Sequence, residues 1–119
     1  MKPAPMQPEH RGYVCSTWAR GQQLGLRIGK AFRLVNRIVD SSTVVVFASG
    51  PTVHAWACGD GDALHYVYVP PELRHRGLAR QLITALFGEY PERIRVTHPW
   101  PGASDRFQHV PHGLLEAAA

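Results

Sequence analysis

Residues 64–83 read LHYVYVPPELRHRGLARQLI, and this stretch decides the fold. Its beginning favours a strand, because β-branched and aromatic side chains predominate. The pair Pro70-Pro71 ends that strand, since proline has no N–H to donate to a ladder. A basic loop then leads to Gly77, after which apolar residues recur at the three- and four-residue steps of an amphipathic helix, over 78–87. The order strand, basic loop, glycine, helix directs the rest of the interpretation.

The start of this helix suits an anion. The N–H groups of a first helical turn lack internal partners, and together with the positive end of the helix dipole they favour phosphate or pyrophosphate. Gly77 permits close approach of the backbone, and the small Ala79 keeps the turn uncluttered. Arg74, Arg76 and Arg80 add positive potential. The alternative is an ordinary strand–loop–helix corner with solvated arginines.

The remaining patterns predict a mixed α/β (α+β) domain. Short turns join three strands, which indicates an antiparallel meander. A strand that follows the 78–87 helix should run parallel to the third strand, as in a β-α-β unit. The expected strands are 43–48, 52–58, 63–69 and 93–97. Two helices are expected before them within 13–37, the first capped by Ser16 or Thr17 and ended by Gly21.

Length and composition indicate one domain. The chain has 119 residues, 13 basic and 9 acidic, for a formal charge of +4. The Pro-rich residues 1–12 are expected to form an extended arm, and 13–119 the domain. The longest apolar run, Val44–Ala48, is far shorter than the roughly 20 residues of a membrane span. Two cysteines are too few for a disulfide framework, so we expect a reducing cytoplasm, or a host cytoplasm for a phage protein.

The loop and helix start resemble motif A of the GNAT N-acetyltransferase superfamily. The family signature is Gln/Arg-x-x-Gly-x-Gly/Ala, and residues 74–79 read RHRGLA. The motif follows a strand and precedes an amphipathic helix, and the wider order of elements is similar over Tyr13 to Thr97. The resemblance implies a GNAT-like fold with a mostly antiparallel sheet, in which a parallel strand pair is splayed at the cofactor site.

The resemblance also implies the ligand, acetyl-CoA, with an amine as acetyl acceptor. The pantetheine arm would bond the backbone of Val67 and Val69 at the end of the third strand. The pyrophosphate would lie on the loop and helix start. The implied residues there are Arg74, His75, Arg76, Gly77, Leu78, Ala79 and Arg80. No metal is expected.

Catalysis in such enzymes needs a base to take a proton from the attacking amine. The sheet position that often supplies a carboxylate in the family falls at Ala63. His65, which strand alternation places on the same face as Ala63, Val67 and Val69, is the candidate base. The alternative is a half-buried histidine with a structural hydrogen bond. Asp62 could act through water or belong only to its turn.

The C-terminal part departs from the family pattern. No tyrosine follows Tyr90 to act as the acid, and Ser104 and His109 lie only roughly in that region. The prolines after His98 predict shortened or missing final strands, with short helical tendencies at 104–109 and 114–118. A minimal, phage-like member, or one completed by a second copy or another chain, would fit.

Two functions of other classes stay open. A GNAT fold that has lost catalysis could serve as a binding or structural module. Four cations at 27, 30, 33 and 37 share a helix face and could bind nucleic acid, but a solvated face is favoured over that interpretation.

Overall fold

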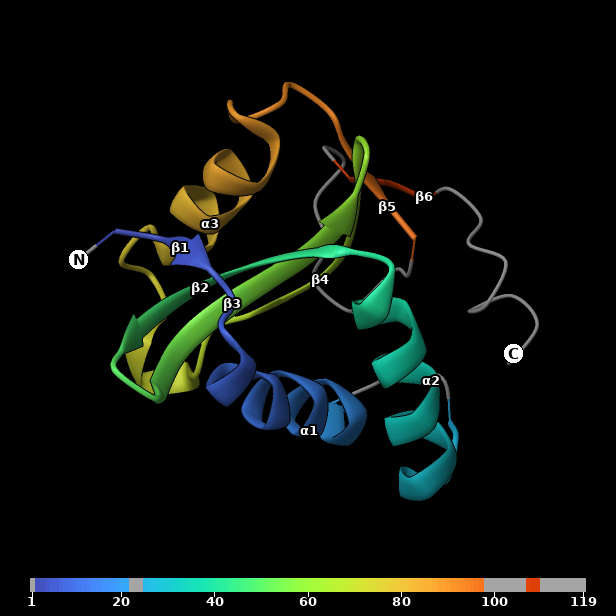
Figure 1. Ribbon diagram of the computed structural model, residues 1–119. Helices are drawn as coiled ribbons and strands as arrows, with labels where there is room; N and C mark the ends of the chain where they lie inside the picture. Colours follow the sequence, from blue (N-terminus) through green and yellow to red (C-terminus); the bar gives the residue numbers. More distant parts are fainter. Residues whose placement is uncertain (1, 22–24, 98–106, 110–119) are drawn as a thin grey trace.

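The computed structural model describes residues 2–21, 25–97 and 107–109, which form a six-stranded sheet with helices on both faces (Figure 1). The strand order is β1-β2-β3-β4-β5-β6. Pairs from β1 to β4 are antiparallel, whereas β4–β5 and β5–β6 are parallel. The strands are β1 (Ala4–Pro5), β2 (Thr43–Ser49), β3 (Thr52–Asp60), β4 (Ala63–Tyr68), β5 (Ile94–Val96) and β6 (Phe107–His109). The fold is therefore a mixed α/β arrangement, as the sequence patterns predicted.

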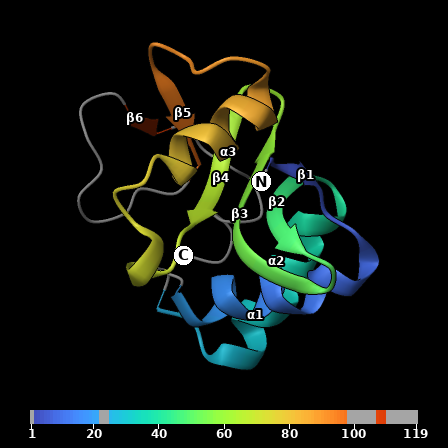
Figure 2. The same cartoon turned by 90° about the vertical axis from the view of Figure 1, so that its left-hand side faces the viewer.

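Helices α1 (Arg11–Gly21) and α2 (Ile28–Asp40) cover one face of the sheet, and α3 (Leu78–Phe87) covers the other (Figures 1 and 2). Successive side chains of a strand point to opposite faces. Val44 and Val46 accordingly pack in the cluster with α1 and α2, while Val45 and Phe47 pack in the cluster with α3. The β-branched run in β2 is buried on both sides because both faces are covered.

The segment around α3 agrees closely with prediction. The helix spans Leu78–Phe87 and ends at Gly88, which has a φ of 85° in the left-handed region that glycine adopts without strain. The meander β2–β3–β4 and the parallel pairing of β4 with β5 are also confirmed.

The N-terminal part differs from prediction. Helix α1 begins at Arg11, so Ser16 and Thr17 lie inside it and are not its cap. The Thr17 hydroxyl donates to the Tyr13 carbonyl at 2.8 Å and accepts from Trp56 Nε1 at 2.9 Å, which ties α1 to β3. Residues 1–12, expected as an extended arm, include a strand paired with β2 and a short 3-10 helix, Pro8–His10.

The C-terminal part is described only at β6. Phe107–His109 is a three-residue strand parallel to β5, so the helical tendency expected at 104–109 is wrong there. Ser104 and the residues of 114–118 lie outside the described residues. In the described part of the chain, every helix is too short or too polar to traverse a lipid bilayer.

Candidate ligand-binding site

The two parallel strands β4 and β5 part soon after they meet. Their paired positions are Ala63 with Arg95 and Leu64 with Val96, and the Thr97 amide donates to the Leu64 carbonyl at 3.0 Å. From Tyr66 to Tyr68, β4 stays paired with β3, whereas no described strand pairs with its opposite edge. The backbone of that edge is therefore available, within the described structure, to another extended group.

A β-bulge marks the point of separation. Tyr66 pairs with Cys58 and Leu64 pairs with Gly59, so His65 is an extra residue with no position opposite it on β3. The bulge shifts the alternation of side chains by one residue. Leu64 and Val67, which strict alternation would place on opposite faces, therefore both pack on the α3 side.

His65 is buried at this fork and only 1% exposed. Its Nδ1 lies 2.8 Å from Thr97 Oγ1, and both side chains are buried. The sequence allowed either a catalytic base or a half-buried histidine with a structural hydrogen bond, and the burial is more complete than that. The sequence did not predict this contact, because Thr97 lies 32 positions from His65 in the chain. The pairing of β4 with β5 brings the two residues together.

The loop after β4 turns sharply into α3. A short 3-10 helix, Pro71–Leu73, follows the double proline, and His75 (φ 64°) and Gly77 (φ 78°) both take left-handed conformations. Gly77 is the N-cap of α3 and carries no side chain to cap the helix. The first intrahelical bond runs from the Gln81 amide to the Gly77 carbonyl, at 3.1 Å. The amides of 78–80 precede that bond, as at the start of any α-helix.

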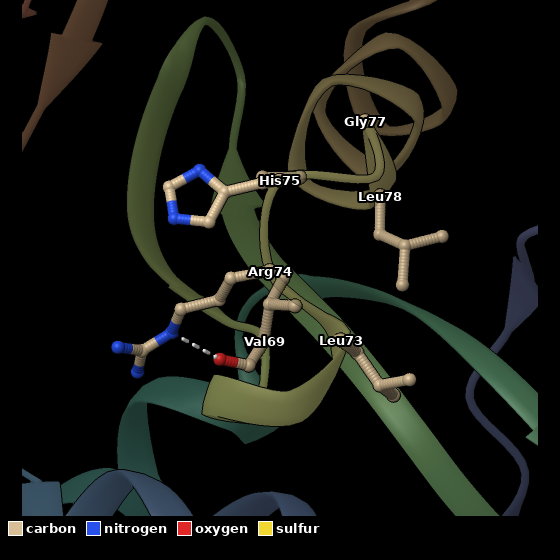
Figure 3. A pocket seen from close by; sticks show the side chains of 7 residues that line it. Val69, Leu73, Arg74, His75, Gly77 and Leu78 are labelled. Atoms are coloured by element: carbon tan, nitrogen blue, oxygen red, sulfur yellow. Dashed lines mark hydrogen bonds between the residues drawn. The ribbon is translucent and has the colours of Figure 1, made fainter.

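The loop encloses a cavity of about 240 Å³, which we call the loop cavity (Figure 3). Arg74 and His75 extend to one side of the loop, and Leu73 and Leu78 to the other. Arg74 Nε donates to the Val69 carbonyl at 2.9 Å, so this guanidinium is held beside the end of β4. The lining residues are Val69, Leu73, Arg74, His75, Gly77, Leu78 and Ala79.

Six of the residues expected to bind a cofactor line the loop cavity, and three do not. Val67 packs against the α3-side core. Arg76 lines a neighbouring cavity. The Arg80 guanidinium lies 4.1 Å above the centre of the Tyr90 ring, a cation–π contact that the sequence analysis did not foresee. The six that meet are Val69, Arg74, His75, Gly77, Leu78 and Ala79.

Two titratable groups on the sheet face covered by α1 and α2, one on β4 and one on β3, are held neutral. Burial raises the pKa of the Tyr66 phenol, and the Arg74 charge offsets part of that rise. The Tyr66 hydroxyl donates to the Gly21 carbonyl at 3.2 Å, which joins β4 to the end of α1. Burial also raises the pKa of the Cys58 thiol to about 12, so Cys58 is no nucleophile near neutral pH.

The described residues hold no group of three or more His, Cys, Asp or Glu side chains that could share a metal ion. Comparison with protein-family models finds none that matches this chain, and comparison with curated proteins finds no match either. Any function for the site must therefore come from its geometry and chemistry.

Proposed function

We propose that this chain is an acetyl-CoA-dependent N-acetyltransferase with a GNAT-like fold, acting on an amine. The observation that carries the proposal is the separation of β4 from β5 just before the left-handed turn into α3. That arrangement leaves a strand edge that leads directly to a helix N-terminus. A ligand with an extended amide-bearing arm and an anionic end matches both parts, and acyl-CoA has both.

The pyrophosphate is assigned to the loop cavity and the start of α3. The amides of 78–80 and the Arg74 guanidinium supply donors and positive charge, and Gly77 keeps the approach to the backbone open. The pantetheine arm is assigned to the edge of β4 from Val67 to Val69. Because Arg74 occupies the Val69 carbonyl, the amides of this arm would exchange with the Arg74 side chain there or use other backbone groups.

The chemistry is an acyl transfer. The amine nitrogen attacks the thioester carbonyl, a C–N bond forms, and the C–S bond breaks to release CoA thiolate. The amine loses one proton to a base, and the thiolate gains one from water. His65 stays the proposed base, since it lies at the fork where the free edge begins. Asp62 is a weaker candidate, because its carboxylate is held 2.6 Å from Arg95 Nη1 in an exposed ion pair.

Calorimetric titration with acetyl-CoA and with CoA tests the binding step. We expect binding by the native chain and a loss of about tenfold in Arg74→Gln, since a charge-assisted contact to phosphate is removed. Arg33→Gln on α2 is the matched control, because that exposed arginine lies away from the loop cavity. Absence of binding at millimolar ligand, or equal affinities for the two variants, would refute the assignment.

The second candidate is a module that binds acyl-CoA without transferring the acyl group. The burial of His65 favours it, because this proposed base is 1% exposed and hydrogen-bonded to Thr97. Release of free thiol during incubation with acetyl-CoA and a panel of amines separates the two. Release above the rate without enzyme supports the transferase, and binding without release supports the module.

A further inference from the structure

A second cavity lies next to the loop cavity. Its volume is about 410 Å³, and we call it the β2–α3 cavity because it lies between these elements. Leu73 and Leu78 line both cavities, so the two cavities are adjacent. The lining residues are Phe47, His54, Leu73, Arg76, Leu78 and Gln81.

The lining divides into an apolar part and a polar part. Phe47, Leu73 and Leu78 form the apolar part, and Phe47 is only 2% exposed, so it is fixed in the core. Arg76 and Gln81 form the exposed polar part. His54 is partly fixed, because its Nε2 lies 3.0 Å from Ser49 Oγ. A few polar groups that converge above an apolar surface are typical of small-molecule sites.

Arg76 is the permanent charge of this cavity. The ion pairs of the described residues are Arg11 with Asp40 and Arg95 with Asp62, so Arg76 has no acidic partner there. Among the described residues, the cavity lining includes neither Asp nor Glu. A guanidinium offers two parallel N–H groups that match the two oxygens of a carboxylate.

We propose that the β2–α3 cavity binds a small organic monocarboxylate with an apolar body. The carboxylate pairs with Arg76, and the hydrocarbon part covers the apolar lining. One guanidinium balances one negative charge, which favours a monoanion over a phosphate monoester. The volume lies within the range of roughly 300–1,000 Å³ that small-molecule sites occupy. This proposal does not depend on acetyl-CoA binding, and it gives Arg76 a ligand other than pyrophosphate.

Titration of isotope-labelled protein followed by NMR tests it, with phenylacetate as probe and phenylacetamide as its uncharged counterpart. We expect phenylacetate to shift the amide signals of His54, Leu73 and residues 76–81, and to bind about tenfold more tightly than the amide. Arg76→Gln should reduce that preference to about twofold or less, whereas the control Arg33→Gln should retain it. Arg76 and Arg33 are both exposed, so neither variant removes a buried contact.

Equal affinities for the two probes, shifts that map elsewhere, or an unchanged preference in Arg76→Gln would each overturn the proposal. A separate variant distinguishes this site from the proposed cofactor site. His54→Ala should weaken phenylacetate binding and leave acetyl-CoA affinity unchanged, because His54 lines the β2–α3 cavity and not the loop cavity. Failure of acetyl-CoA to bind at all would refute the proposed function while leaving the phenylacetate result intact.

Discussion

Two glycines at the ends of α3 offer a matched test of the proposed cofactor site. Gly77 precedes the helix with a φ of 78°, and Gly88 follows it with a φ of 85°. A Cβ added at either position meets no atom within 4 Å. Gly77→Ala and Gly88→Ala therefore introduce the same kind of backbone strain and no collision, but only Gly77 lines the loop cavity.

The magnitude follows from the left-handed conformation. An L-residue there costs about 1–2 kcal/mol relative to glycine. For a domain of this length, 1 kcal/mol lowers Tm by roughly 3–5 °C. We expect each variant to melt roughly 3–10 °C below the native chain, and the two variants to have similar Tm values. In Gly77→Ala the new methyl group would also lie on the path proposed for pyrophosphate to the amides of 78–80. The affinity for acetyl-CoA should then fall at least about tenfold, or ~1.4 kcal/mol.

Thermal unfolding and calorimetry on the two variants measure both quantities. Equal acetyl-CoA affinities for Gly77→Ala and Gly88→Ala would refute the placement of pyrophosphate at the start of α3. A much larger loss of stability in one variant would refute the strain argument instead. The two outcomes are independent, because one concerns binding and the other concerns the free energy of unfolding.

Three further predictions concern stability, each measured by urea unfolding. Gly59→Ala should lower the free energy of unfolding by about 2 kcal/mol or more, because its Cβ would lie 2.6 Å from the Ala63 carbonyl oxygen. The control Gly12→Ala inside α1 meets no atom and should cost nothing. Similar free energies of unfolding for the two variants would contradict this. His10→Ala should lower the free energy of unfolding by about 2 kcal/mol, since the buried ring accepts a hydrogen bond from the Gln7 amide at 3.0 Å and donates one to the Gly50 carbonyl at 2.8 Å. An unchanged free energy of unfolding would show that these hydrogen bonds contribute nothing. The Cys58 thiol loses its proton from about pH 9 in the unfolded chain and only near pH 12 in the folded chain. The free energy of unfolding should therefore fall from pH 9 upward, and at pH 10 the fall should be about 1.4 kcal/mol larger than in Cys58→Ala. Parallel pH curves for the two proteins would contradict this.

The sequence predicted α3 and its loop well because the signals there are local. Proline ends a strand through its own missing N–H, and a glycine in the left-handed region ends a helix through its own missing Cβ. Both effects act within a few residues, so the boundaries at Leu78 and Gly88 could be identified without knowledge of the rest of the fold. The strands of the meander were found for a similar reason, since short turns fix antiparallel neighbours.

The errors arose where distant segments decide the structure. The strand Ala4–Pro5 pairs with the edge of β2. No local pattern within the Pro-rich segment predicts that pairing. Threonine often caps a helix, yet the Thr17 hydroxyl accepts a hydrogen bond from Trp56, 39 residues away. Strict alternation along β4 failed because a single extra residue reverses it, and a period of two cannot reveal where the extra residue lies.

The bulge in the β3–β4 pair lies at Gly59, beside the point where β5 leaves β4. This residue pairs with Leu64 across the bulge, where the β3 backbone lies so close to the Ala63 carbonyl that no side chain fits. Past His65, β4 stays paired with β3, while its pairing with β5 ends at Leu64. The edge proposed for the ligand therefore begins beside a glycine that does not line the loop cavity. If Gly59→Ala still folds in mild conditions, its acetyl-CoA affinity should fall with the fork disturbed, whereas His10→Ala, equally destabilised but distant from the fork, should bind as the native chain does.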